Sequence, residues 1–199
     1  MKHHLQESTS STTRATTGRQ RAGDEWKSGG ADKEEIRRKV ESAGRPGPGH
    51  RALDALVGDW KAEFKCWSEP GGEANTSQGM AKTRWTLDGH FLEEEFHGEM
   101  MGQQFTGRNL IGYDNMKQTF NSVWVSDMQT SMFTCEGRGE NNNRVITLEG
   151  TASCSATGRT DIPMKTVFRI LSPDKHIFEM FDGSRGGDGK TMEITYTRS

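Results

Sequence analysis

The sequence predicts an all-β fold, an antiparallel up-and-down barrel of about ten strands with a short helix before the first strand. Apolar and polar residues alternate in many short segments after position 58, and clusters of Gly, Pro, Asn or Asp separate these segments. No interval between the segments is long enough for a crossover helix. Consecutive hairpins therefore connect the strands, and closure of the sheet removes its unpaired edges.

The first 49 residues differ in composition from the rest of the chain. They carry ten Lys or Arg against seven Asp or Glu, about +3, whereas the remainder carries sixteen against twenty-one, about −5. Residues 1 to about 30 are rich in Ser, Thr, Gly and Arg without apolar periodicity, and we expect them to be disordered. The segment 32–42 has the acid-then-base order of a helix but a thin apolar stripe. We predict a disordered or weakly helical tail over 1–49 and a barrel domain over 50–199.

The barrel segment opens with one helical turn, because Leu53, Leu56 and Val57 lie at i, i+3 and i+4 and Gly58 ends the turn. Each strand that follows has a single apolar face, as alternation in a half-buried strand requires. The predicted strands span residues 59–67, 77–87, 90–100, 103–113, 117–126, 128–138, 144–153, 161–171, 176–182 and 190–198.

The stretch "LVGDW" marks the entrance to the first strand. Gly58 permits a sharp turn there, and Trp60 would then close the base of the barrel. Burial of its indole stabilises the fold by about 4–6 kcal/mol. If the last strand lies beside the first, Arg198 can place its guanidinium over the indole for about 0.5–2 kcal/mol more. Gly-x-Trp at the start with Arg at the end resembles the calycin barrels, the lipocalins and their relatives.

Three longer segments, "HRALDALVGDW", "LDGHFLEEEFHGEMMGQQFTGRNLIGYDNMKQTFNSVWVSD" and "MEITYTR", are similar to the lipocalin-like family called domain of unknown function 1579. The resemblance covers about His50 to Arg198. It implies a β-barrel, and because the family brings no established activity, it assigns no catalytic residue. Its most specific pieces are Gly58-x-Trp60, Gly107 with Gly112-Tyr113-Asp114, and Trp124-x-x-Asp127.

A barrel of more than eight strands has room for a small ligand. The leading functional hypothesis is a non-enzymatic barrel that binds a small, mostly apolar molecule. Trp85, Phe105, Trp124 and the methionines would line the cavity, and Arg108 or Tyr113 would supply a polar contact.

Two of the ligand-binding candidates have a structural alternative. An inward Arg108 would need a partner or an anionic ligand, whereas an outward one would pair with a glutamate such as Glu95. Asp127 follows the Trp124 strand and either caps a turn or contacts a ligand.

An enzyme acting on a small molecule inside the barrel is the second hypothesis. Glu93, Glu95, His97 or Asp127 would then serve as acid, base or metal ligand. The first three share one strand face, which suits a metal. Apolar residues occupy the opposite face, so the same acids could instead face solvent and pair with Lys or Arg on neighbouring strands.

The third hypothesis is a haem-binding barrel or an interaction surface. Haem would need an inward histidine near an open mouth, and His97 and His176 are the strand candidates. We expect His176 to be exposed, because it follows a Pro-Asp turn.

Composition excludes several classes of function. The acidic barrel segment argues against nucleic acid as a partner, and no apolar run reaches membrane length. The three cysteines have neither CxxC nor zinc spacing, so we expect a reduced, cytoplasmic protein, monomeric or homodimeric. No phosphate loop, dinucleotide fingerprint or Gly-x-Ser-x-Gly motif occurs, and nothing in the sequence requires a cofactor.

Overall fold

The computed structural model describes residues 30–100, 102–155, 157–185 and 189–199. It divides the chain into two units, Met1–Ser42 and Ala43–Ser199. The predicted disorder of residues 1 to about 30 falls on residues that lie outside this description.

Helix α1, Gly30–Gly44, contains the helix predicted over 32–42. Ion pairs one turn apart run along it, with Arg37 bonded to both Glu34 and Glu41 and Lys39 to Glu35 at 2.6–2.7 Å. Each such solvent-exposed pair stabilises a helix by about 0.3–0.5 kcal/mol, so these pairs supplement the weak apolar stripe.

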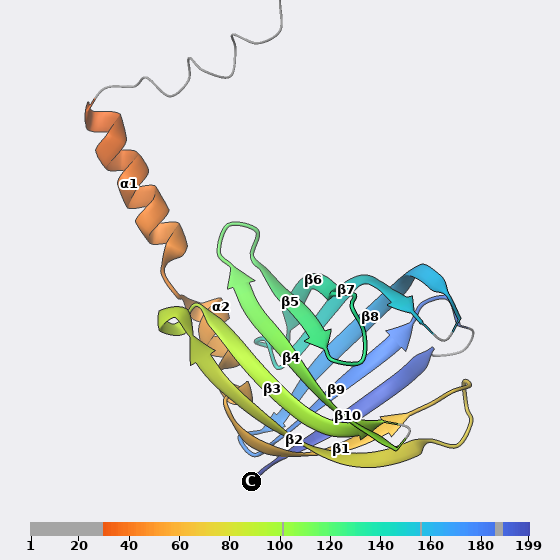
Figure 1. Ribbon diagram of the computed structural model, residues 1–199. Coiled ribbons are helices and arrows are strands. Elements are labelled where there is room, and N and C mark those ends of the chain that lie inside the picture. Colours follow the sequence, from red (N-terminus) through yellow and green to blue (C-terminus); the bar gives the residue numbers. More distant parts are fainter. Residues whose placement is uncertain (1–29, 101, 156, 186–188) are drawn as a thin grey trace, which may run out of the picture. The chain divides into compact units, whose positions relative to one another are not determined.

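The second unit is a closed barrel of ten antiparallel strands, which confirms the predicted fold class (Figure 1). Two short helical turns, α2 and η1, precede the strands, and the turn η2 follows the second strand. The elements are α2 Pro48–Arg51, η1 Ala52–Leu56, β1 Gly58–Cys66, β2 Asn75–Thr86, η2 Leu87–Gly89, β3 Phe91–Met100, β4 Gln103–Asp114, β5 Thr119–Ser126, β6 Phe133–Glu140, β7 Val145–Cys154, β8 Arg159–Ser172, β9 Lys175–Asp182 and β10 Lys190–Arg198.

The sixth strand begins later than predicted, at Phe133 rather than at residue 128. The chain after β5 stays bonded to β4, because the Asp127 amide donates to the Thr106 carbonyl at 3.1 Å and the Asp127 carboxylate accepts the Thr106 amide. Residues 127–132 therefore form a connecting loop before the β6 ladder begins.

The barrel closes where β1 pairs with β10, with Trp60 directly opposite Arg198. Trp60 is 1% exposed, and its Nε1 donates to the Leu56 carbonyl at 3.0 Å. The Arg198 guanidinium lies 4.4 Å from the centre of the indole and donates to the Val57 carbonyl. Gly58 has φ +157°, and a Cβ there would collide with the guanidinium, so this position requires glycine. These contacts are the ones predicted from Gly-x-Trp and the terminal Arg.

His176 is buried at this closed end, so the expectation that it is exposed was wrong. Its ring lies edge-on to Trp60 at 4.5 Å and stacks on Tyr196 at 4.3 Å. The reason is the register, because His176 is the second residue of β9 and pairs with the inward-facing Tyr196. Burial, with a further contribution from Arg198, lowers the pKa of His176 to about 3.

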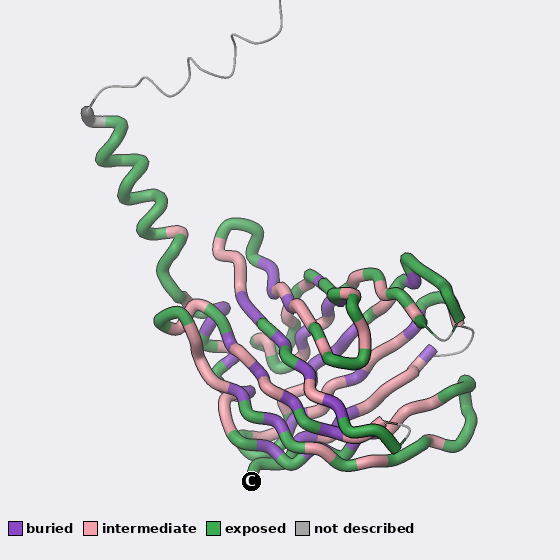
Figure 2. Tube along the Cα trace, in the orientation of Figure 1, coloured by how far each residue is buried: buried purple, intermediate pink, exposed green. Residues whose placement is uncertain are grey.

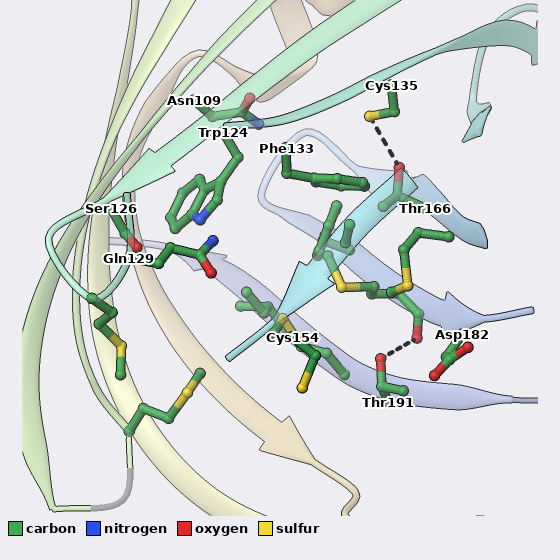
Figure 3. A pocket seen from close by; sticks show the side chains of 18 of the residues that line it. Asn109, Trp124, Ser126, Gln129, Phe133, Cys135, Cys154, Thr166, Asp182 and Thr191 are labelled. Carbon is green, nitrogen blue, oxygen red and sulfur yellow. Dashed lines mark hydrogen bonds between the residues drawn. The ribbon is translucent and has the colours of Figure 1, made fainter. Parts of the chain in front are cut away.

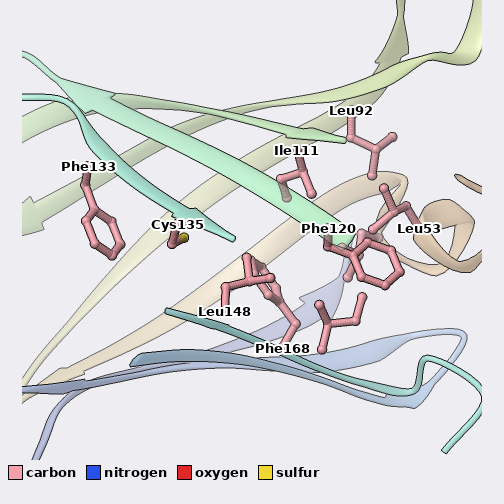
Figure 4. Close-up of a cluster of buried hydrophobic side chains, with 10 residues drawn as sticks. Leu53, Leu92, Ile111, Phe120, Phe133, Cys135, Leu148 and Phe168 are labelled. Atoms are coloured by element: carbon pink, nitrogen blue, oxygen red, sulfur yellow. The ribbon is translucent and has the colours of Figure 1, made fainter. Parts of the chain in front are cut away.

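Buried and exposed residues alternate along the strands, so the apolar side chains converge inside the barrel (Figure 2). At the closed end Leu53 of η1 packs against Leu92 and Phe120 (Figure 4). Leu53 and Leu92 have no exposed surface. The helical turn thus closes one end of the barrel, and the last residues of β1, β3, β5, β7 and β9 lie at the other.

Candidate ligand-binding site

The half of the barrel away from η1 contains a cavity of about 520 Å³. Side chains of β4 and β5 form one wall and those of β7, β9 and β10 another, as Trp124 and Thr191 illustrate (Figure 3). About half of the lining residues are aromatic or sulfur-containing. The principal apolar residues are Phe96, Phe105, Trp124, Phe133, Phe178, Met100, Met128, Met164, Met180 and Met192.

Trp124 lies against the wall because the neighbouring strand carries a glycine at that point. A Cβ on Gly107 would collide with the six-membered ring of Trp124. Phe96 lies over Gly98 in the same way, and its ring stacks on Phe105 at 5.6 Å. Both glycines therefore allow large aromatic rings to cover the wall of the cavity without crossing its interior.

Polar groups on the cavity wall are hydrogen-bonded to one another. The Ser122 hydroxyl donates to Asn109 Oδ1 at 2.7 Å, and the Thr191 hydroxyl donates to the Met180 carbonyl at 3.3 Å. Figure 3 shows Asn109 beside Trp124. A ligand with a polar group would meet these amide and hydroxyl groups at fixed positions on an otherwise apolar wall.

Glu94 is the charged residue at the inner end of the cavity. It is 7% exposed and accepts hydrogen bonds from the Tyr196 hydroxyl, at 3.5 Å, and from the Thr83 side chain. Burial raises the pKa of Glu94 to about 7, because these two bonds offset only part of the desolvation of the carboxylate. Tyr196 also stacks on His176, so Glu94 lies between the packed closed end and the cavity.

The other charged residues of the described cavity lining are held near the mouth. Asp182 accepts from the Ser184 hydroxyl and from Arg185 Nε, and Arg185 also donates to the carbonyls of Trp67 and Ser68. Burial opposes ionisation of Asp182, but the Ser184 and Arg185 bonds outweigh it and lower the Asp182 pKa. Arg159 donates to the Ser184 hydroxyl at 2.9 Å. The mouth therefore carries an ion pair that is already formed.

Residues 45–198 match the profile of the family described as protein of unknown function DUF1579. The chain belongs to the DUF1579 family. This confirms the resemblance drawn from the sequence, and the matched residues include the whole barrel with its cavity.

The following solved structures are similar to this DUF1579 chain. Rv2717c from M. tuberculosis aligns with a TM-score of 0.58 at 13% identity, covering 78% of this chain and 99% of that one. A redesigned β-barrel aligns with a TM-score of 0.40 at 15% identity, covering 75% and 96%. No curated protein sequence matches significantly. Among the described helices, none has the length and apolarity needed to cross a membrane.

Of the aromatic residues predicted for the site, two line the cavity of the DUF1579 barrel and two lie in its closed half. Phe105 and Trp124 are part of the lining. Trp85 instead donates from Nε1 to Asp54 at 2.9 Å, next to η1. Tyr113 packs edge-on against Phe120 at 4.9 Å, so its ring contributes to the core.

Arg108 lies on the outer face of the barrel, the outward alternative of the prediction. It bonds Glu93 at 3.2 Å and Glu95 at 3.0 Å, and His97 Nε2 lies 2.9 Å from Glu95. All four side chains are more than 40% exposed. A guanidinium thus occupies the space between the two carboxylates that the metal hypothesis needed. Within the described residues, no cluster of His, Cys, Asp and Glu suits a metal ion.

The remaining candidates also lie outside the cavity. Asp127 is exposed and binds the Thr106 amide with both carboxylate oxygens, at 3.0 and 3.1 Å, which is the turn-capping alternative. Neither His97 nor His176 is among the residues that line the cavity. The residues that the enzyme and haem hypotheses placed inside the barrel are therefore not among the lining of this cavity.

Glu94 is the site residue that the sequence reasoning missed. The signal was present, because Glu94 falls between the inward Leu92 and Phe96 in a strictly alternating strand. Its two acidic neighbours, Glu93 and Glu95, belong to the outer face. The run of three acids was interpreted as an outer-face feature, so the inward-facing Glu94 was overlooked.

Proposed function

We propose that the open half of the barrel binds a small, mostly apolar molecule, with Phe105 and Trp124 among its contacts. The observation that supports this is the cavity of about 520 Å³, whose lining is mainly apolar and rich in aromatic and methionine side chains. Small-molecule sites commonly measure about 300–1,000 Å³ and combine apolar walls with a few polar groups. Methionine side chains adapt their shape, which suits a pocket that closes around a flexible ligand.

Binding of a neutral apolar dye tests this function. N-phenyl-1-naphthylamine fluoresces strongly only in apolar surroundings, and its absorption overlaps tryptophan emission. We expect bright, saturable probe emission together with quenching of tryptophan, because Trp124 forms part of the cavity wall. An intact barrel that gives no saturable response to this probe or to other neutral apolar molecules of similar size would contradict the proposal.

A pair of substitutions on β7 locates the bound probe. Ala152 faces the cavity, and its neighbour Thr151 is exposed on the outer face of the same strand. Ala152→Trp should fill the cavity and weaken probe binding about tenfold or more, a loss of at least ~1.4 kcal/mol. Thr151→Trp adds the same indole outside and should leave the affinity unchanged. Equal affinities in the two variants would place the probe elsewhere.

We further propose that the chain works in a reducing compartment, the cytoplasm, without a nucleic-acid or membrane partner. Cys66 and Cys135 are free thiols, and burial raises the pKa of both, that of Cys66 to about 11. Such thiols stay protonated and are poor nucleophiles, which favours packing over catalysis. Fluorescence microscopy of a tagged chain tests the location, and light scattering distinguishes a monomer from a homodimer.

The barrel domain itself is proposed to be residues 50–199, with residues 1–49 as a tail. The family match from residue 45 and the start of α2 at Pro48 support a boundary close to this position. Limited proteolysis should remove the tail and leave a fragment that still binds the dye. Cleavage that abolishes binding would move the boundary toward the N-terminus.

A further inference from the structure

The cavity has an acid at its inner end and no base beside it. Of the described lining residues, Glu94, Arg159, Asp182 and Arg185 carry charge, and the last three are hydrogen-bonded near the mouth. The inward arginine that the sequence hypothesis allowed, Arg108, lies on the outer face and pairs with glutamates there. A cavity that binds a carboxylate ligand needs a positive charge at its polar end, whereas this cavity has an acidic residue there.

The neighbours of Glu94 leave part of its carboxyl group available. A carboxylate can accept about four hydrogen bonds, and Glu94 receives one from Tyr196 and one from Thr83. The Tyr196 bond is long, at 3.5 Å. A buried carboxylate in this state is costly unless a cation or further donors approach it, and the approach that the structure leaves is through the cavity.

We propose that the ligand of this barrel is an amphipathic amine, whose ammonium group binds Glu94 and whose apolar part lies among Phe96, Trp124 and the methionines. The inference rests on the proposed function and names the chemical class of ligand that this site takes. An ammonium supplies the positive charge and the donors that Glu94 lacks, and an apolar body fills the remaining wall. A carboxylate in the same place would meet a like charge inside a low-dielectric cavity.

The protonation of Glu94 gives the site a dependence on pH. The elements packed around Glu94 contribute Thr83 from β2, Asn109 from β4 and Tyr196 from β10. Burial and the neighbouring Glu94 raise the pKa of Tyr196 well above its ordinary value, so it stays a neutral donor. His176 behind it is neutral above about pH 5, since its pKa is about 3. Glu94, with a pKa of about 7, is thus the group that changes charge near neutrality.

Three ligands that share one chain and differ in head group test the inference. Decylamine, decanol and decanoate are titrated into the full chain by calorimetry, at about pH 8.5 and about pH 5.5, on either side of the Glu94 titration. An aliphatic amine remains protonated at both values. At the higher pH we expect decylamine to bind about tenfold or more tightly than decanol, with decanoate weakest. At the lower pH the advantage of decylamine over decanol should shrink.

Two glutamate substitutions on β3 provide the variant and its control. Glu94→Gln retains the size and hydrogen bonding of the protonated acid and should remove both the preference for decylamine and its pH dependence. Glu95→Gln removes the same charge from the next residue, which is on the outer face, and should keep both. If Glu94→Gln does not fold, the pH comparison in the unmodified chain carries the test.

The outcomes separate the two proposals. If none of the three ligands binds and the dye also fails, the proposed function is wrong. If they bind with decanoate or decanol equal to or tighter than decylamine at the higher pH, the cavity is used but the amine inference is overturned. A preference for decylamine that survives in Glu94→Gln also overturns it.

Discussion

The two ends of this barrel are built from the same strands, but their interiors are filled differently. At the closed end the Arg198 guanidinium lies over Trp60, and His176 packs edge-on against Trp60 and stacks on Tyr196. Leu53 packs against Leu92 and Phe120 at the same end. At the open end the aromatic rings lie along the walls and leave about 520 Å³ between them. The closed end therefore supplies stability, and the open end is the part that can change its contents without unfolding the barrel.

The largest expected effect comes from emptying the closed end. Trp60→Ala should lower the free energy of unfolding by about 3–5 kcal/mol, because the indole is 1% exposed and its removal leaves a hole that the barrel cannot fill. Trp124→Ala, at the half-buried wall of the cavity, should cost about 1–3 kcal/mol. Urea denaturation measures both. Equal losses would remove the distinction between a packed end and a hollow one.

Two buried titrating groups should give the ends opposite pH responses. His176 has a folded pKa of about 3, below its ordinary 6.5, so stability falls as pH drops from 6.5 toward 3. Glu94 has a folded pKa of about 7, above its ordinary 4.5, so stability falls as pH rises from 4.5 to 7. Each slope is about 1.4 kcal/mol per pH unit, and the two cancel between pH 4.5 and 6.5.

Single substitutions uncover the two slopes. Relative to the unmodified chain, His176→Phe should lose about 2–3 kcal/mol as pH rises from 4.5 to 6.5, and Glu94→Gln should lose as much as pH falls over the same range. Denaturation midpoints at several pH values give the comparison. Curves parallel to that of the unmodified chain would mean that these groups keep their ordinary pKa values in the fold.

The glycine beside Trp124 allows a test of how the open end stays hollow. Gly107→Val should push the indole off the wall into the cavity, costing about 1–3 kcal/mol of stability and weakening dye binding. A shift of tryptophan emission should accompany it. Leu110→Val places the same side chain on the exposed outer face of β4, away from the indole, and it serves as the control. Unchanged dye affinity in Gly107→Val would show that the cavity wall accommodates the valine without the indole entering the cavity, which would contradict the prediction.

The smallest effect belongs to the outer face. Arg108→Ala breaks ion pairs with Glu93 and Glu95 that are largely solvent-exposed, so the unfolding free energy should change by at most about 1 kcal/mol. Ligand binding should not change at all. A large loss of ligand binding would indicate that Arg108 contacts the ligand and would contradict its placement on the outer face.

Local pattern was enough to predict the strands and the closure of the barrel. Alternation with a period of two indicates which side chains share a face, and the turn residues mark where each strand ends. The predicted contact between Trp60 and Arg198 followed because consecutive hairpins in a closed sheet bring the first and last strands together. The same reasoning failed at His176, where exposure was inferred from the preceding turn, because the register places its ring against Tyr196 inside the barrel.

The contents of the cavity depended on the tertiary structure. The register sets Arg108 beside its ion-pair partner Glu95, and the position of Trp124 is decided by Gly107 on the neighbouring strand. The alternating pattern already placed Glu94 inside, but only packing across the barrel set it against Tyr196 and raised its pKa. Faces are a property of adjacent residues along the chain. The volume and charge of a barrel's cavity depend on side chains from strands that are far apart in sequence. A local sequence pattern therefore cannot predict them.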